Sequence, residues 1–156
     1  YNTAVLLKMI PELARVYHKD KWRERPQLSS TAEAAKYLVG LYQGRVEEVF
    51  YILCLDSQNK LIRAEILDKG TVSEASVAPR KLVEIILRNK SAGVILAHNH
   101  PGGNPRPSRA DMMSTKRIID TLQPLSIAVH DHIIVSGEEY YSFRRQGLLA
   151  SGKFGE

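Results

Sequence analysis

The feature that most constrains this chain is a short apolar run that ends in two histidines. Residues 94–97 have the length and composition of a buried β-strand, and they lead directly into His98 and His100. Alternate side chains of a strand point to the same face, so we expect the two imidazoles to converge on one spot. A stiff loop of glycines and prolines, residues 101–107, follows and can fold back over the end of the strand.

Asp111 comes just after this loop, where Ser108 is predicted to open a helix. In the first helical turn its carboxylate can approach both imidazole rings. Two neutral imidazoles and one carboxylate suit zinc, and three protein ligands leave the fourth tetrahedral position open for water. We therefore predict one Zn²⁺ per chain, held by His98, His100 and Asp111 in a site of the catalytic type. The single cysteine, Cys54, excludes a cysteine-rich structural zinc site.

A structural interpretation of the same residues has to be weighed. Ser108 and Asp111 have the spacing of a helix N-cap and its third helical residue, and an aspartate in the first turn also complements the helix dipole. A histidine pair at a strand end, taken alone, is more often structural than metal-binding. The buried strand, the histidines, the loop and the Ser-x-x-Asp sequence together favour a metal site, with capping as an additional role.

Length and composition indicate one globular domain. The chain has 156 residues, of which 44% are hydrophobic and 25% charged. No apolar run is long enough for a membrane span and no signal-peptide pattern opens the chain, which with a single cysteine predicts a cytoplasmic protein without a membrane partner. The net charge of +5 would favour nucleic acid only if it were concentrated on one face. The densest basic stretch, residues 19–25, is interleaved with acidic residues and is interpreted as solvated loop.

Periodicity predicts an α/β domain with a mixed sheet covered by helices. The central strand is residues 48–55, apolar on both faces, and a polar turn joins it in a hairpin to residues 60–67. Further strands are expected at residues 71–77, 94–97 and 127–135, and a short strand or helix at residues 140–149. The expected helices are residues 31–44, a helix from Pro79 with the apolar stripe Leu82, Val83, Ile86 and Leu87, and a helix from Ser108 with the face Met112, Ile119 and Leu122.

The two ends of the chain are predicted to lie outside this core. Pro11 interrupts any long helix in residues 4–18, so residues 13–18 are interpreted as a short edge strand. Residues 19–28 are predicted to be loop, and residues 151–156 a loose tail.

The residues of the predicted site resemble a known family. His98-x-His100-Pro101, then six residues, then Ser108-x-x-Asp111 is the signature of the JAMM (JAB/MPN+) metalloproteases. The segments LDSQNKLI at 55–62, ILAHNHPGGNPRPSRAD at 95–111 and DHIIV at 131–135 resemble the bacterial RadC-like JAB-domain proteins. The resemblance covers residues 29–149 and implies an MPN/JAB fold, which is a cytidine-deaminase-like mixed β-sheet flanked by helices.

The resemblance also divides the chain. It implies a RadC-like JAB/MPN+ metalloprotease domain at residues 29–150 and a C-terminal tail at residues 151–156. Residues 1–28 differ from the helix-hairpin-helix region of full-length RadC proteins and are similar to the extended N-terminal arm of domain-only relatives.

The activity implied by the resemblance is zinc-dependent hydrolysis of peptide or isopeptide bonds in a protein substrate, next to a small protein modifier or a bacterial analogue. A glutamate from an upstream strand would deprotonate the attacking water. The matching position is Glu48, with Glu47 as its competitor, and only one can serve because a one-residue shift turns a strand side chain to the other face. The Ser108 hydroxyl would hydrogen-bond the developing oxyanion, and Asp131 and His132 would support the ligands from outside.

Other classes stay open on the sequence alone. A DNA-associated protein of repair or mobile elements would bind or process nucleic acid, and a non-catalytic MPN module would keep the fold for interaction. HNH nucleases are a poor match, because their three residues are dispersed over a ββα-metal element rather than contiguous. Zinc deaminases need the H-x-E and P-C-x-x-C sequences, which a single cysteine excludes.

Overall fold

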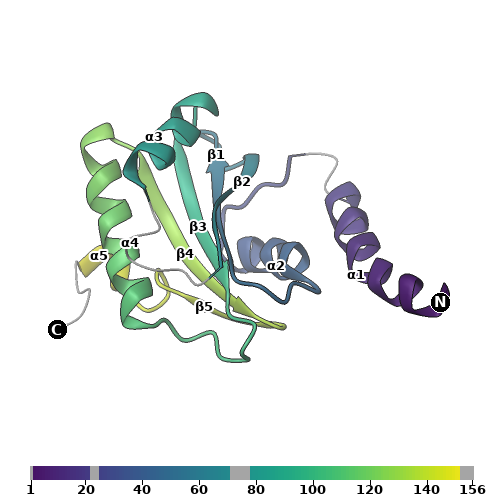
Figure 1. The fold of residues 1–156 in the computed structure, drawn as a ribbon. Helices are drawn as coiled ribbons and strands as arrows, with labels where there is room; N and C mark the ends of the chain where they lie inside the picture. Colours follow the sequence, from purple (N-terminus) through teal and green to yellow (C-terminus); the bar gives the residue numbers. More distant parts are fainter. Residues whose placement is uncertain (1, 22–24, 71–77, 152–156) are drawn as a thin grey trace.

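The computed structural model describes residues 2–21, 25–70 and 78–151, and there the chain forms a mixed five-stranded sheet with helices on both faces (Figure 1). The strands are β1 Val49–Leu55, β2 Leu61–Lys69, β3 Gly93–Asn99, β4 Ala128–Ser136 and β5 Glu139–Ser142. Their order across the sheet is β2-β1-β3-β4-β5; β3 and β4 are parallel and the other neighbours antiparallel. The predicted α/β class is confirmed.

The helices divide between the two faces of the sheet (Figure 1). Helix α2 Thr31–Tyr42 covers one face, and α3 Pro79–Arg88 and α4 Arg109–Leu122 cover the other. The short helices η1 Gln123–Leu125 and α5 Leu148–Ser151 complete the described elements. All seven residues of β1 are buried, as expected of a doubly covered strand, because its side chains alternate between the α2 side and the α3/α4 side.

The α3 helix begins at Pro79 as predicted, but its buried face is slightly rotated. Leu82 and Ile86 are buried, as expected, and Ile85 joins them. Leu87, which was assigned to the apolar stripe, is 65% exposed. The inward face is therefore narrower than the apolar pattern indicated.

The α4 helix is also rotated from the predicted orientation. Its buried residues are Asp111, Ser114, Thr115, Ile118 and Leu122, whereas Met112 and Ile119 are half-buried. Polar residues lie on the inward side because this helix faces the histidines of β3 rather than a wholly apolar surface. Apolar periodicity does not detect buried polar residues, so the sequence predicts a buried face of α4 that is shifted by one residue from the observed one.

The N-terminal segment is helical, so the predicted edge strand at residues 13–18 and the extended arm are wrong. Helix α1 spans Asn2–Lys21 and contains Pro11 in its interior. Good helix formers flank the proline on both sides. The proline removes one backbone hydrogen bond, and this loss is confined to the preceding turn of the helix. Pro11 also lies against Gly44, where an added Cβ would come within 2.5 Å of the proline side chain. In Figure 1, α1 lies to the side of the sheet, beyond α2.

Two further predictions concern residues outside the described part of the chain: the short strand at residues 71–77, and the tail beyond Ser151, which itself belongs to α5. Among the described helices, none has the length and apolarity needed to cross a bilayer.

Candidate metal centre

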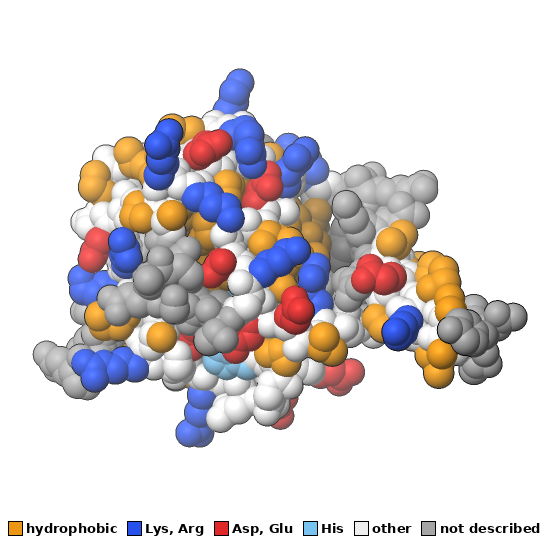
Figure 2. All heavy atoms as spheres, viewed as in Figure 1, with side chains coloured by type: hydrophobic (Ala, Val, Ile, Leu, Met, Phe, Trp, Pro, Cys, Tyr) orange, Lys and Arg blue, Asp and Glu red, His pale blue; other side chains and the backbone are white. Residues whose placement is uncertain are grey.

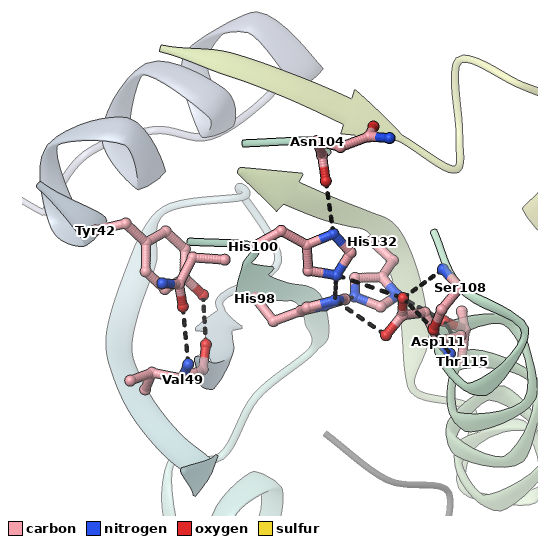
Figure 3. A network of polar contacts seen from close by, with 10 residues as sticks. Tyr42, Val49, His98, His100, Asn104, Ser108, Asp111, Thr115 and His132 are labelled. Carbon is pink, nitrogen blue, oxygen red and sulfur yellow. Dashed lines mark hydrogen bonds and ion pairs between the residues drawn. The ribbon is translucent and has the colours of Figure 1, made fainter. Parts of the chain in front are cut away.

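Three predicted ligands meet where β3 ends and α4 begins (Figure 3). The Nε2 atoms of His98 and His100 are 2.9 Å apart. Asp111 Oδ1 lies 3.1 Å from the first of these nitrogens, and its Oδ2 lies 3.5 Å from the second. One ligand atom from each residue falls within 4.8 Å of the others. The structure thus brings together the residues that the sequence singled out for zinc.

The polypeptide delivers these side chains by short-range geometry. His98 belongs to β3, and its ring stacks on Phe50 of β1 with ring centroids 5.5 Å apart. His100 follows the strand, and its backbone N–H donates to the carbonyl of Val135 at 2.8 Å, which continues the pairing with β4. The side chains of His98 and Asp111 are almost fully buried, whereas that of His100 is 19% exposed. Solvent therefore reaches the centre on the His100 side.

Asp111 is oriented by the capping box at the start of α4. The Ser108 backbone N–H and hydroxyl both donate to Asp111 Oδ2, at 2.6 and 2.7 Å, and the Asp111 N–H donates back to the Ser108 hydroxyl at 3.1 Å. The predicted capping role is confirmed. The hydroxyl hydrogen of Ser108 is therefore directed at the carboxylate, and it would have to rotate away to serve an oxyanion.

A chain of hydrogen bonds sets the tautomer of His98. Thr115 donates its single hydroxyl hydrogen to the carbonyl of Asp111 at 2.6 Å, so it must accept from Nδ1–H of His132, also at 2.6 Å. Burial keeps the pKa of His132 well below its ordinary value, so this ring is neutral and its Nε2 is an acceptor. That nitrogen accepts from Nδ1–H of His98 at 2.9 Å. With its hydrogen on Nδ1, His98 has its Nε2 lone pair directed at the other two ligands.

A single contact sets the tautomer of His100. Its Nδ1 is 2.8 Å from the carbonyl oxygen of Asn104 (Figure 3), and a carbonyl only accepts, so Nδ1 carries the hydrogen. The Nε2 of neutral His100 is then a lone pair as well. Second partners of this kind are typical of histidines that ligate metals.

Two lone pairs and a carboxylate at this separation require a cation between them. Without a metal a proton can take that place: the pKa of His100 is raised from 6.5, chiefly by its hydrogen bond with Asp111. Burial alone would raise the pKa of Asp111, but its contacts with His100, His98 and Ser108 outweigh burial and hold that pKa well below its ordinary value. A neutral N, neutral N and anionic O set of this kind fits Zn²⁺.

Glu47 and Glu48 lie just before β1. The register between β1 and β3 ends at the pair Phe50 and His98, and Glu48 is two residues before Phe50. If the alternation of β1 is continued to these residues, it directs Glu48 to the Phe50 side of the sheet and Glu47 to the other. After Asp111, the Glu48 carboxylate also helps to raise the pKa of His100. This placement favours Glu48 as the base, and its catalytic role remains a prediction.

The two predicted supporting residues differ in what they contact. His132 bonds directly to His98, as expected. Asp131 does not bond to a ligand in the described structure. Its carboxylate accepts four hydrogen bonds, from the hydroxyls of Thr31 and Ser142 and from the backbone N–H groups of Arg144 and His132. Adjacent residues of a strand face opposite ways, so only one of the pair can reach the metal centre. Asp131 instead connects β4 to α2, to β5 and to the segment after β5.

Thr115 is the site residue that sequence reasoning missed. It lies one helical turn after Asp111, on the same face of α4, and it is fully buried. The i, i+4 spacing from a predicted ligand is the signal that could have found it.

A cavity of about 870 Å³ lies on the α2 side of the sheet, and His100 is the one metal-ligand candidate among its lining residues. It lies between α2, the end of β3 and the turn between β4 and β5. Its charged lining residues are Lys36, Arg45 and Glu138. His98, Ser108, Asp111 and Glu48 do not line this cavity, so it borders the centre only at His100.

Comparison with known proteins agrees with this fold. A family model described as the RadC-like JAB domain matches residues 28–148. The UPF0758 protein of Pseudoalteromonas translucida is 43% identical over 145 residues, and one from Vibrio cholerae is 41% identical over 145 residues. A third, from Herminiimonas arsenicoxydans, is 40% identical over 143 residues. The chain belongs to the RadC-like JAB-domain family.

The matched region is longer than the resemblance predicted from the sequence. In the first two relatives it covers 93% of this chain and 65% of the relative. Because 145 of 156 residues are matched, the similarity reaches back to residue 12 or earlier and includes part of α1. The chain spans about two thirds of the length of these relatives.

Proposed function

We propose that this protein is a zinc-dependent hydrolase of the JAMM type that cleaves peptide or isopeptide bonds. The observation that carries the proposal is the convergence of the Nε2 atoms of His98 and His100 with the Asp111 carboxylate, both imidazole tautomers being set by hydrogen bonds from behind. Three ligands and an approach from the His100 side are the arrangement of a catalytic rather than a structural zinc site. Membership of the JAB-domain family supports the same conclusion.

The chemistry divides between the metal and the protein. Zinc held by the three ligands would lower the pKa of a coordinated water to about 7 and polarise the substrate carbonyl. Glu48, whose charge acts on His100, accepts the proton from the attacking water and returns it to the leaving amine, a contribution typically worth about 10²–10⁴ in rate. Ser108 keeps the Asp111 carboxylate in place, and its hydroxyl can also turn toward the developing oxyanion.

The substrate is proposed to be a peptide or protein, such as a target joined to a small protein modifier or its bacterial analogue. The peptide would approach from the side on which His100 is exposed, because the side chains of His98 and Asp111 are closed off from solvent. Burial of these two ligands would also shield a bound metal from bulk solvent on their side.

The test pairs zinc quantification with a cleavage screen on the full chain, purified without chelator. His98→Ala is expected to lose the metal, whereas Glu48→Gln keeps the metal and loses hydrolysis. Glu47→Gln is the matched control, since the same change on the other strand face should leave both properties intact. Wild-type cleavage by Glu48→Gln would make the mechanism wrong, and a wild-type chain that retained no zinc would refute the metal site. Zinc retention without any cleavage would instead favour a non-catalytic MPN module.

DNA association is the second candidate, and the net charge of +5 supports it. On the face shown in Figure 2, however, basic side chains are interspersed with acidic ones rather than gathered in a stripe. Duplex binding measured over a range of salt concentrations separates the two functions. Affinity that falls steeply with salt, with a log–log slope of about −0.9 for each phosphate contacted, would favour DNA.

A further inference from the structure

Asn99 lies between the two histidine ligands and uses both ends of its amide on the neighbouring strand. Its Oδ1 accepts from the backbone N–H of Val49 at 2.8 Å, and its Nδ2 donates to the backbone carbonyl of Glu47 at 2.9 Å. The residue is only 4% exposed. The two bonds bracket a single residue, Glu48, so one rigid side chain holds the backbone on both sides of it.

Other contacts show why this clamp is needed. The regular ladder between β1 and β3 ends at the pair Phe50 and His98, so Glu48 lies beyond it. The Glu48 carbonyl accepts from the Gly70 N–H at 2.9 Å, and the Tyr42 hydroxyl donates to the Val49 carbonyl at 3.1 Å (Figure 3). Neither contact joins this segment to β3, whereas the Asn99 amide does.

We propose that Asn99 is a positioning residue that fixes Glu48 relative to the metal ligands. The inference rests on the proposed function, in which Glu48 moves the proton. Asn99 is covalently joined to His98 and His100. Its side-chain amide therefore fixes the position of the Glu48 backbone relative to the segment that carries two of the ligands. Alanine at this position would leave the buried Val49 N–H and the Glu47 carbonyl without this partner, and the segment would have to move to pair the N–H again.

The first experiment tests the clamp in the metal-free full chain, by amide hydrogen exchange in NMR. In Asn99→Ala the Val49 amide is expected to exchange at least about tenfold faster than in wild type. Tyr42→Phe is the matched control: it removes a hydrogen bond from the Val49 carbonyl but leaves the amide bonded to Asn99. Unchanged exchange of Val49 in Asn99→Ala would overturn the proposal.

The second experiment measures kinetics on a substrate found in the cleavage screen. Asn99→Ala is expected to keep zinc and KM close to wild type and to lower kcat roughly 10- to 100-fold, the cost of a base displaced by about 1 Å. The double variant Asn99→Ala/Glu48→Gln should be no slower than Glu48→Gln alone, since both changes remove one contribution. Multiplied losses in the double variant, or an effect through zinc affinity or KM, would show a merely structural role and refute the proposal.

A third readout separates failure of this inference from failure of the proposed function. If the wild type cleaves nothing, the protein is loaded with Co²⁺ and the pseudocontact shift of the Glu48 amide is measured. A shift that changes in Asn99→Ala and not in Tyr42→Phe supports positioning even without hydrolysis, and an unchanged shift overturns it. If no metal binds, the exchange of the Val49 amide decides alone.

Discussion

Thr115→Val removes the hydroxyl at the far end of the hydrogen-bond chain that sets the tautomer of His98. Valine has nearly the same shape, and the site is fully buried, so the change deletes one acceptor without opening a cavity. The Nδ1–H of His132 then has no partner in place of the 2.6 Å contact. In its alternative tautomer, His132 would donate from Nε2 to Nδ1 of His98. His98 would then carry its hydrogen on Nε2, the atom that must bind the metal.

The magnitude follows from the lost hydrogen bond. A buried donor left without its acceptor costs about 1–3 kcal/mol. At about 1.36 kcal/mol for each factor of ten, zinc affinity should fall roughly 5- to 150-fold, a range that includes the roughly 10- to 100-fold typical of residues behind metal-bound histidines. The Thr115 change should therefore weaken zinc binding without abolishing it.

The assay is competition for zinc against a chromophoric chelator, on the full chain at neutral pH. Ser114→Ala is the matched control, because it deletes a buried hydroxyl from the adjacent residue of α4 that makes no hydrogen bond in the described structure. Nitrogen-15 NMR of the histidines should also show Nδ1–H on His98 in the wild type. Wild-type zinc affinity in Thr115→Val would refute the tautomer argument.

Three other outcomes test separate parts of the structure. Zinc affinity should fall as pH decreases, and the loss should begin above pH 6.5, because the pKa of His100 is raised in the metal-free protein and a protonated imidazole cannot coordinate zinc. Chelator competition across about pH 5–8 measures this affinity, and an affinity that did not change with pH would contradict the prediction. Asp131→Ala should lower the free energy of unfolding by about 3 kcal/mol or more, because four hydrogen-bond donors lose the carboxylate that accepts from them. The zinc affinity of the folded variant should stay within a few fold of the wild-type value. A specific loss of zinc would place Asp131 at the metal after all. Leu82→Ala should cost about 2–5 kcal/mol in urea unfolding and Leu87→Ala less than about 0.5 kcal/mol, and equal costs would contradict the observed face of α3.

The metal ligands were predictable because they are close in sequence. His98 and His100 share a strand end, and Asp111 follows a short loop, so local geometry alone brings the three together. The capping box of Ser108 and Asp111 is equally local and was anticipated for the same reason.

Features that depend on contacts distant in sequence were harder to predict. The rotation of α4 follows from Thr115 and Asp111 facing the histidines, and apolar periodicity does not register inward polar residues. Pro11 suggested a break, yet α1 continues through it. The Asn99 clamp joins residues about fifty positions apart, so the sequence near Asn99 gives no pattern from which these contacts could be predicted.

The residues that would hold the metal and the residue that would move the proton come from different pieces of the chain. The ligands lie on one continuous stretch from β3 to α4, whereas Glu48 precedes β1. A descendant of this protein could therefore lose Glu48 and keep its zinc, so that a metal-loaded relative need not be an enzyme. Metal content and the presence of a glutamate at this strand start should be scored as independent characters when the family is sorted into active and inactive members.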